Sequence, residues 1–272
     1  MRILVTGASG HLGQKLSMHL VSAGHQVTGL DLQARANSPF PVFTADLSRY
    51  SEAWTAAFAG QDAIIHLAAD RAPEANWASV IPNNIDAVLN LFEAARSHKV
   101  PRIVFASSNW VLGGHRFSEG PLGADTTPHP VNAYGMSKLM GERIGAHYAA
   151  LHGMTVIATR IGWTQWTHGN QPGPHMAMGR WGQLMWLSDK DFLSGMTAAA
   201  TTPATGFVVV NLMSNNPGMR WSLEETRRAL GFTPQDGAPA TLPLPVRLKE
   251  FGAWLSQTGI PRLMKRMTGP DW

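Results

Sequence analysis

The chain contains no cysteine, and this absence removes several kinds of chemistry at once. Disulfide bonds, thiolate nucleophiles and cysteine-ligated metal sites are excluded, because each needs a sulfur that the sequence lacks. Charged residues are also few, at 15% of 272 residues, which disfavours a long disordered or coiled-coil segment. The hydrophobic share of 44% instead predicts a globular protein with a sizeable core.

Long apolar runs and clusters of one charge are missing as well. The longest apolar stretches, such as 207–210, are far too short to cross a bilayer. The formal net charge of +4 is mild and spread out, so a solvated face explains it; an anion-attracting patch in the C-terminal region is the alternative. A glycine-rich loop begins at Gly7, which leaves no room for a signal peptide. We therefore expect a cytoplasmic protein with neither membrane nor nucleic-acid partners.

Short apolar runs alternate with helical patterns along the first 160 residues. The runs predict strands at 3–5, 26–30, 42–43, 63–66, 102–106 and 155–160. Helical spacing of apolar residues predicts helices at 11–23, 48–59, 81–98 and 132–151. This alternation is typical of an α/β fold, and it predicts a Rossmann-type doubly wound parallel sheet with helices on both faces.

The alternation of strand and helix patterns ends after residue 161. Residues 162–185 are rich in Gly, Trp, Met, His and Pro, which predicts a small, loop-rich C-terminal substrate-binding cap. We expect a single integrated domain with a cofactor-binding core at 1–160, the cap with a returning strand and helix at 161–237, and a tail at 238–272. The amphipathic stretch 246–255 within the tail favours a docked helix.

The segment 6–13, Thr-Gly-Ala-Ser-Gly-His-Leu-Gly, follows the first expected strand and opens the first helix. Glycines in this setting allow a tight turn, a close approach of the backbone to a pyrophosphate, and packing of helix on strand. The free N–H groups of the helix then face the phosphates. Gly7, Gly10, His11, Leu12 and Gly13 are thus predicted to bind a dinucleotide.

Asp31 ends the second expected strand, where a carboxylate can bind the hydroxyls of the adenosine ribose. A carboxylate there repels a 2′-phosphate, so NAD is predicted in preference to NADP. Arg35 lies close by in the sequence and can soften this preference.

Tyr134 and Lys138 are four residues apart in an expected helix, so both lie on one face about one turn apart. A phenol is a poor base at neutral pH, but a nearby ammonium group and a positive nicotinamide ring lower its pKa. Ser108 follows the fifth expected strand, at the edge of a parallel sheet where ligands bind. A Tyr-x-x-x-Lys pair alone is often just two exposed residues on the surface of a helix. Together with the glycine loop and the serine, it predicts a hydride-transfer site.

These motifs resemble the extended short-chain dehydrogenase/reductase superfamily, which includes NAD-dependent epimerases and dehydratases, over roughly residues 1–235. The shared residues include 6–13, Asp46-Leu47, 66–69, Asn84, Ser107-Ser108, 134–138 and Arg160. The resemblance implies that the catalytic residues are Ser108, Tyr134 and Lys138. It implies that further cofactor contacts come from Asp46, Leu47, Leu67, Ala68, Ala69, Asn84, Tyr134, Lys138 and Ile161. His66 is interpreted as packed at a strand end rather than catalytic.

Within this superfamily the chain resembles the uronate dehydrogenases, on segments 102–109, 134–138, 160–162, 186–188 and 191–192. The resemblance implies oxidation of the anomeric carbon of a cyclic hexuronic acid with NAD. It places Arg71, Ser108, Asn109, Trp110, Tyr134, Trp163 and Arg180 on the substrate side.

Several of these substrate-side positions depart from the pattern of that family. Trp110 replaces a histidine, Trp163 replaces a serine, and Arg71 replaces a small hydroxyl residue. Arg180 lies one residue out of register with the arginine that binds the carboxylate. The indoles bury apolar area and donate one hydrogen bond each, so the pocket can suit a substrate other than a hexuronate.

The leading prediction is an NAD-dependent dehydrogenase for a small hydroxylated substrate, such as a uronate or another sugar. An epimerase or dehydratase that retains its NAD and a non-catalytic NAD-binding regulator are the alternatives. The tryptophans of the cap either pack it on the sheet or offer a stacking platform for a sugar ring. His168 and His175 lack companion ligands, so no metal is expected. By resemblance to the superfamily, a homodimer through the helices 81–98 and 132–151 is predicted.

Overall fold

The computed structural model describes residues 1–35 and 37–259. Its centre is a seven-stranded sheet in which every neighbouring pair is parallel, in the order β3-β2-β1-β4-β5-β6-β7. The strands are β1 (Arg2–Thr6), β2 (Gln26–Asp31), β3 (Val42–Thr44), β4 (Ala63–His66), β5 (Arg102–Ser108), β6 (Thr155–Ile161) and β7 (Phe207–Leu212). The order reverses direction between β1 and β4, which is the switch point of a doubly wound sheet. The predicted Rossmann-type fold is confirmed.

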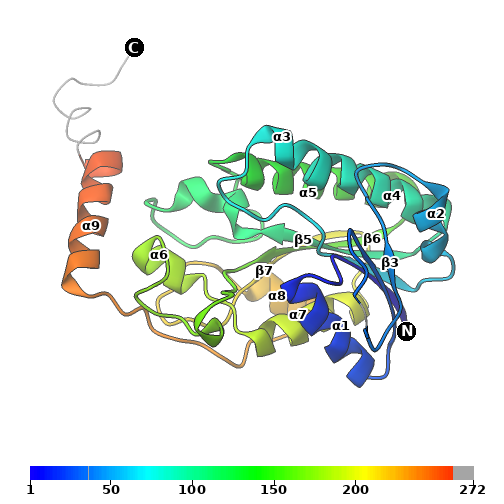
Figure 1. Cartoon of the computed structure of the whole chain (residues 1–272). Helices are drawn as coiled ribbons and strands as arrows, with labels where there is room; N and C mark the ends of the chain where they lie inside the picture. Colours follow the sequence, from blue (N-terminus) through cyan, green and yellow to red (C-terminus); the bar gives the residue numbers. More distant parts are fainter. Residues whose placement is uncertain (36, 260–272) are drawn as a thin grey trace, which may run out of the picture.

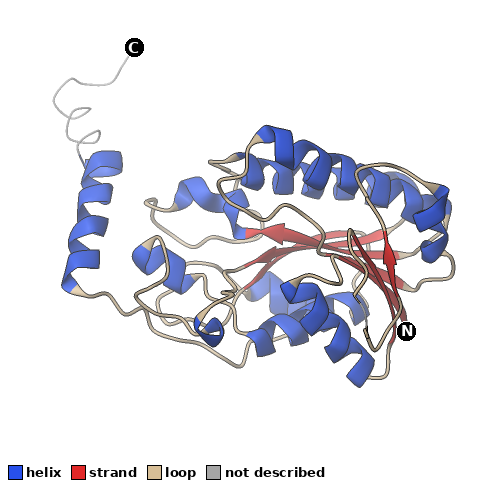
Figure 2. Cartoon of the chain, in the orientation of Figure 1, coloured by secondary structure: helices blue, strands red, loops and turns tan. Residues whose placement is uncertain are grey.

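Helices cover both faces of this sheet (Figures 1 and 2). The helices are α1 (His11–Ser22), α2 (Glu52–Thr55), α3 (Trp77–Val80), α4 (Ala87–Ser97), α5 (Ala133–His152), α6 (Gly179–Leu184), α7 (Asp189–Thr201), α8 (Glu224–Leu230) and α9 (Leu244–Trp254). In the orientation of Figure 1, α3, α4 and α5 lie above the sheet, whereas α1, α7 and α8 lie below it. Because both faces are covered, central strands such as β1 and β4 carry near-continuous apolar runs.

Two hydrophobic clusters fill the space between the sheet and its helices. One contains Phe92, Phe105 and Val156 on the side of α4 and α5, and the other contains Leu16, Ile65 and Phe192 on the side of α1 and α7. A third, smaller cluster around Trp181, Met185 and Trp221 lies between the cap and the ends of the strands. This third cluster fixes the cap beside the carboxyl ends of β5 and β6.

Capping residues mark the beginning and the end of α5, the helix that carries Tyr134 and Lys138. The Asn132 side chain accepts a hydrogen bond from the backbone N–H of Gly135 at 2.7 Å, which caps the start of α5. Gly153, with φ of +66°, ends the helix in the left-handed conformation that favours glycine. The prediction of a helix over 132–151 is confirmed.

The predicted helix at 81–98 is longer and less regular than expected. It begins as α3, passes through a π-helical turn at Ile81–Asp86, and continues as α4. The predicted helix at 48–59 is shorter, comprising α2 and a 3₁₀ turn at Ala56–Phe58. Residues 161–237 contribute β7, α7 and α8 to the layers of the core, and α6 and its neighbouring loops form the cap.

The predicted C-terminal helix forms, and it contacts α6. The Glu250 carboxylate accepts a hydrogen bond from the Arg180 N–H at 2.7 Å. Val246 and Leu255 of the amphipathic stretch are half-buried, whereas Leu248 and Phe251 are 63% and 57% exposed. The helix is therefore docked with its apolar face only partly covered. The rest of the predicted tail, 260–272, lies outside the described residues.

Candidate active site

A cavity of about 630 Å³ opens along the carboxyl ends of the parallel strands. It is lined by the glycine loop, the ends of β2, β5 and β6, the segment after β4, and the start of α5. The structure places at this cavity the following residues predicted from the sequence: Gly7, Gly10, His11, Leu12, Gly13, Asp31, Asp46, Leu47, Leu67, Ala68, Ala69, Arg71, Ser108, Asn109, Trp110, Tyr134, Lys138, Ile161 and Trp163. One cavity therefore combines the expected cofactor and substrate positions.

The glycine loop has the geometry of a phosphate cradle. Gly7 has φ of +71°, and a methyl group added there would meet the backbone nitrogen of Ala68 at 2.8 Å. A methyl group on Gly13 would meet the Gly7 carbonyl oxygen at 2.0 Å, so this glycine lets α1 pack against the loop. No side chain caps α1, and its first turn contains no acidic residue. The helix N-terminus therefore presents its N–H groups and positive dipole to an anion.

Asp31 and Asp46 line the part of the cavity beyond this loop. The Asp31 Oδ2 atom accepts a hydrogen bond from the Ser9 N–H at 2.9 Å, which holds the carboxylate beside the glycine loop. Asp46 accepts hydrogen bonds from the backbone and hydroxyl of Ser48, at 3.0 and 2.6 Å. Together with the open helix terminus, these residues fit a dinucleotide: phosphates at α1, and a ribose diol at Asp31.

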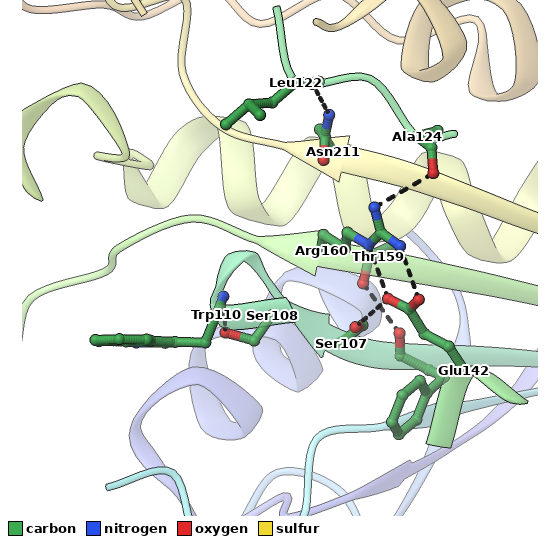
Figure 3. Close-up of polar contacts among 10 residues, drawn as sticks. Ser107, Ser108, Trp110, Leu122, Ala124, Glu142, Thr159, Arg160 and Asn211 are labelled. Carbon is green, nitrogen blue, oxygen red and sulfur yellow. Dashed lines mark hydrogen bonds and ion pairs between the residues drawn. The ribbon is translucent and has the colours of Figure 1, made fainter. Parts of the chain in front are cut away.

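Helix α5 and strand β5 bring the three predicted catalytic residues to the same cavity. Ser108 ends β5, and its Oγ accepts a hydrogen bond from the Trp110 N–H at 3.2 Å (Figure 3). The Lys138 Nζ lies 5.2 Å from the centre of the Phe105 ring and 5.7 Å from the centre of the Tyr134 ring. The ammonium group is thus held between two aromatic rings, within the range of cation–π attraction.

Burial changes the proton affinity of both groups on α5. It lowers the pKa of Lys138 from 10.5 to about 8, because the side chain is only 4% exposed and the charged form loses hydration. Burial also raises the pKa of Tyr134, while the polar contact with Ser108 and the positive charge of Arg71 oppose this rise. The protein alone therefore favours neutral tyrosine, and a cation brought beside the phenol would favour its deprotonation.

Asn84 organises the wall of the cavity without lining it. Its amide oxygen accepts from the Asp70 N–H at 2.7 Å, and its amide nitrogen donates to the Asp70 carbonyl at 2.9 Å and to Ser137 Oγ at 3.0 Å. These bonds use the amide fully and tie the segment after β4 to α5. Asn84 also lies within the π-helical turn, where the irregular backbone aims its side chain inward. Asn84 is not among the residues that line the cavity, and its predicted contact with the cofactor stays a prediction.

His66 at the end of β4 is fully buried. Its Nδ1 is 2.7 Å from Thr6 Oγ1, and its ring stacks against Phe105 with 6.0 Å between ring centres. Burial, and to a smaller extent the charge of Lys138, lower the pKa of His66 to about 3. The imidazole is therefore neutral at physiological pH, and it packs between strands as the sequence indicated.

On the substrate side, backbone and amide hydrogen bonds hold Asn109 and Trp163 in place. The Asn109 amide donates to the Ile161 carbonyl at 3.2 Å, which links the ends of β5 and β6. The Trp163 N–H donates to the Met185 carbonyl at 2.7 Å, in a bridge to the cap. Trp110 and Trp163 are both among the residues that line the cavity, so this end of it includes two tryptophans.

Arg71 and Trp166 form a stack across the mouth of the cavity. The Arg71 guanidinium carbon lies 3.7 Å from the centre of the Trp166 ring, and that ring stacks on His11 with 5.0 Å between centres. The stack joins the glycine loop, the segment after β4 and the cap. Trp166 is 54% exposed, whereas Trp181 and Trp186 are buried at 8% and 6%. Trp181 and Trp186 therefore pack the cap, Trp163 packs against it and also lines the cavity, and Trp166 lines the cavity while largely exposed.

Arg180, predicted as an anchor for an anionic substrate, does not line the cavity. It lies at the start of α6, where its N–H is bound to Glu250 and its guanidinium lies beside Gly218. The side chain of Arg180 is exposed. His168 and His175 stack with 3.9 Å between ring centres. Within residues 1–35 and 37–259, no group of three or more His, Asp or Glu side chains is arranged as a metal site.

The chain resembles a known protein family and several characterised enzymes. Residues 3–163 match the model of the NAD dependent epimerase/dehydratase family. The chain is 34% identical over 252 residues to the L-arabinose 1-dehydrogenase (NAD(P)(+)) of Haloferax volcanii, with 87% of this chain and 97% of that protein covered. It is 33% identical over 241 residues to the uronate dehydrogenase of Agrobacterium fabrum, with 88% and 86% covered.

The fold is also similar to solved structures. A mutant of uronate dehydrogenase from Agrobacterium tumefaciens, complexed with NAD, superposes with a TM-score of 0.74 at 30% identity, covering 92% of this chain and 89% of that one. Among the described residues, no helix is both long and apolar enough to cross a membrane.

Proposed function

Because the chain belongs to the NAD dependent epimerase/dehydratase family, we propose that it is an NAD-dependent dehydrogenase acting on a small, sugar-like substrate. It transfers a hydride from a carbinol or hemiacetal carbon to NAD. The observation that carries the proposal is the single cavity lined by the glycine loop, Asp31, Ser108, Tyr134 and Lys138. The named relatives support it, since they include dehydrogenases of arabinose and of uronates.

In this proposal Tyr134 is the general base. It takes the proton of the substrate hydroxyl while the carbon-bound hydrogen leaves as hydride, and the bound NAD supplies the ring that accepts this hydride. Ser108 holds the same substrate oxygen, and Asn109 holds a neighbouring one. Lys138 lies beside the phenol, so its ammonium group stabilises the phenolate form.

The aromatic end of the cavity limits what the substrate can be. Trp110 and Trp163 offer flat apolar faces on which the C–H face of a sugar ring can stack. The volume of about 630 Å³ must hold the dinucleotide as well, so little space is left for a second large group on the substrate. A monosaccharide or its acid therefore fits this proposal better than a nucleotide-linked sugar.

The decisive experiment mixes the purified protein with NAD and follows NADH absorbance across hexuronates, neutral aldoses and simple alcohols. We expect reduction with at least one sugar or uronate, and a loss of at least about a hundredfold in kcat for Tyr134→Phe, the usual scale of general-base catalysis. Tight NAD binding without reduction by any compound would refute the dehydrogenase proposal. Turnover of a sugar without added NAD would instead indicate an epimerase that retains its cofactor.

We also propose a homodimer. The surface of α3, the π-helical turn, α4 and α5 exposes Trp77, Ile81, Leu89, Met136 and Met140, which suits a self-complementary helical interface. Sedimentation velocity tests this directly, and an ideal monomer at micromolar concentration would contradict it. A cytoplasmic location also stays a prediction, for cell fractionation to test.

A further inference from the structure

A buried ion pair lies directly behind the predicted catalytic residues. The Glu142 Oε1 and Oε2 atoms accept hydrogen bonds from Arg160 Nε and Nη2, both at 2.9 Å (Figure 3). The two side chains are only 4% and 3% exposed. The same Glu142 Oε1 accepts a third hydrogen bond, from Ser107 Oγ at 2.6 Å. The carboxylate is therefore surrounded by donors and isolated from solvent.

This pair connects the elements that carry the proposed chemistry. Glu142 lies one helical turn beyond Lys138 and two beyond Tyr134 on α5, so all three side chains project from the same side of that helix. Ser107 immediately precedes Ser108 at the end of β5 and pairs in register with Arg160 on β6. A single carboxylate thus ties α5 to both strands on whose ends the cavity opens.

The connection extends from β6 to the cap. The Arg160 Nη1 atom donates to the Ala124 carbonyl at 3.3 Å, and the Asn211 amide donates to the Leu122 carbonyl at 2.9 Å (Figure 3). Leu122 belongs to the cluster against which Trp163 packs. The segment that supports the aromatic end of the cavity is therefore held by the same arginine that binds Glu142.

Stability alone is a poor explanation for such a pair. Removing two charges from water is costly, and well-packed apolar residues of similar volume often serve a fold equally well or better. An apolar pair has no directional hydrogen bonds, whereas here one hydrogen bond from β5 and two from β6 set the distance and rotation of α5 relative to these two strands. Catalysis depends on such settings, because a displacement of about 1 Å can reduce a rate by about a hundredfold.

We propose that Glu142 and Arg160 are positioning residues, which hold Tyr134 and Lys138 in register with Ser108. The inference rests on the proposed function for its rate effects, but not for its structural ones. Neither residue lines the cavity, so neither touches the substrate or the cofactor. The pair acts through the spacing between helix and strand.

The kinetic test compares Glu142→Gln, Arg160→Met and the double variant E142M/R160M with the wild type. Each single variant leaves the other member of the pair as a buried charge without its counter-charge, so we expect both stability in urea and kcat to fall. The apolar double variant should regain stability, whereas its kcat stays at least about tenfold below the wild type, with the Kd for NAD within about threefold. Recovery of kcat to within about twofold, together with stability, would overturn the proposal.

The control is the surface pair of Glu225 and Arg228 on α8, whose side chains are 25% and 76% exposed and join neighbouring turns of one helix. Glu225→Gln should change neither kcat nor the NMR signal described next. A loss of kcat in this control equal to that of Glu142→Gln would contradict a specific role of the buried pair.

A second readout needs no turnover and therefore separates this inference from the proposed reaction. The protein contains three tyrosines, so ¹³Cζ-tyrosine labelling gives three signals, and Tyr134→Phe identifies the signal of Tyr134. We expect this signal to shift in Glu142→Gln and in E142M/R160M, in the same direction as in Ser108→Ala. An unchanged Tyr134 signal in the well-folded double variant would overturn the positioning role, even if no substrate has been found.

Discussion

The buried charge of Lys138 should lower the free energy of unfolding. Replacement of this lysine by methionine should therefore stabilise the protein while abolishing turnover. Burial lowers the pKa of this lysine from 10.5 to about 8. At pH 7 the folded state must keep the ammonium group charged in a dry site, whereas the unfolded chain keeps it in water. Methionine has a similar length and no charge, so it removes this cost without leaving a large hole.

The size of the effect follows from the shift in pKa. A change from 10.5 to about 8 corresponds to about 3 kcal/mol of lost stability at pH 7. Attraction to the rings of Phe105 and Tyr134 returns about 1 kcal/mol. We therefore expect Lys138→Met to raise the free energy of unfolding by about 2 kcal/mol at pH 7.

The gain should disappear at high pH. Between pH 8 and 10.5 the unfolded chain binds the proton and the folded protein does not, so the stability of the wild type rises with pH in this window. At pH 9.5 the cost of burial has fallen by about 2 kcal/mol, and the variant and the wild type should be nearly equal.

Urea unfolding of the apo-protein at pH 7 and pH 9.5 measures this difference. Lys190→Met is the matched control, because Lys190 is exposed on α7 and should give no gain at either pH. If Lys138→Met proves less stable than the wild type at pH 7, or keeps the same difference at both pH values, the reasoning about burial is refuted.

Three further substitutions test the cofactor cleft. Gly7→Ala should weaken NAD binding by at least about tenfold in calorimetry, because φ is +71° and the new methyl group meets Ala68 at 2.8 Å; unchanged affinity would contradict the tight approach of the two backbones. Asp31→Ser should raise the ratio of kcat/KM for NADP over NAD by at least about tenfold, since the carboxylate that repels a 2′-phosphate is gone; an unchanged ratio would place the ribose elsewhere. Trp166→Ala removes the stack on His11 and Arg71, so NADH should dissociate several times faster in stopped-flow fluorescence. A slower release would show that this stack does not retain the bound cofactor.

The sheet and the glycine loop could be predicted because their signals are local. Buried strands appear as short apolar runs, and the loop needs its glycines at fixed positions within a few residues. Apolar periodicity does not predict helix α7, although a local signal for it exists. Ser188 accepts a hydrogen bond from the Asp191 N–H at 3.0 Å, and Asp189 lies in the first turn, so these capping residues indicate where the helix begins.

The π-helical turn within 81–86 could not be predicted in the same way. Its residues keep a helical pattern of apolar side chains, so periodicity indicates one continuous helix. The turn instead accompanies the hydrogen bonds of Asn84 with Asp70 and Ser137, and Ser137 is 53 residues away in the chain. Only the folded arrangement brings these partners together.

The ion pair of Glu142 with Arg160 illustrates the same limit from another side. Each residue is an ordinary charged side chain in a sequence of which charged residues make up 15%. In folded proteins such residues are usually exposed. Both are buried because α5 packs across β5 and β6, so that a helix residue meets a strand residue 18 positions later. Spacing along the chain alone does not show which charges lie inside.

The choice of substrate depends on which charged side chains line the cavity. Arg71 and Lys138, both predicted at the site, line it, whereas Arg180 is not among the lining residues. Lys138 is occupied beside Tyr134, so a substrate carboxylate would have to be met by Arg71. The face of this guanidinium is already stacked on Trp166, but its edge is still open to a planar anion, because its hydrogen-bond donors lie in the plane of the group. We therefore expect a hexuronate to gain an ion pair with Arg71 that its parent aldose lacks. Comparing kcat/KM for each hexuronate with that for its aldose tests this expectation.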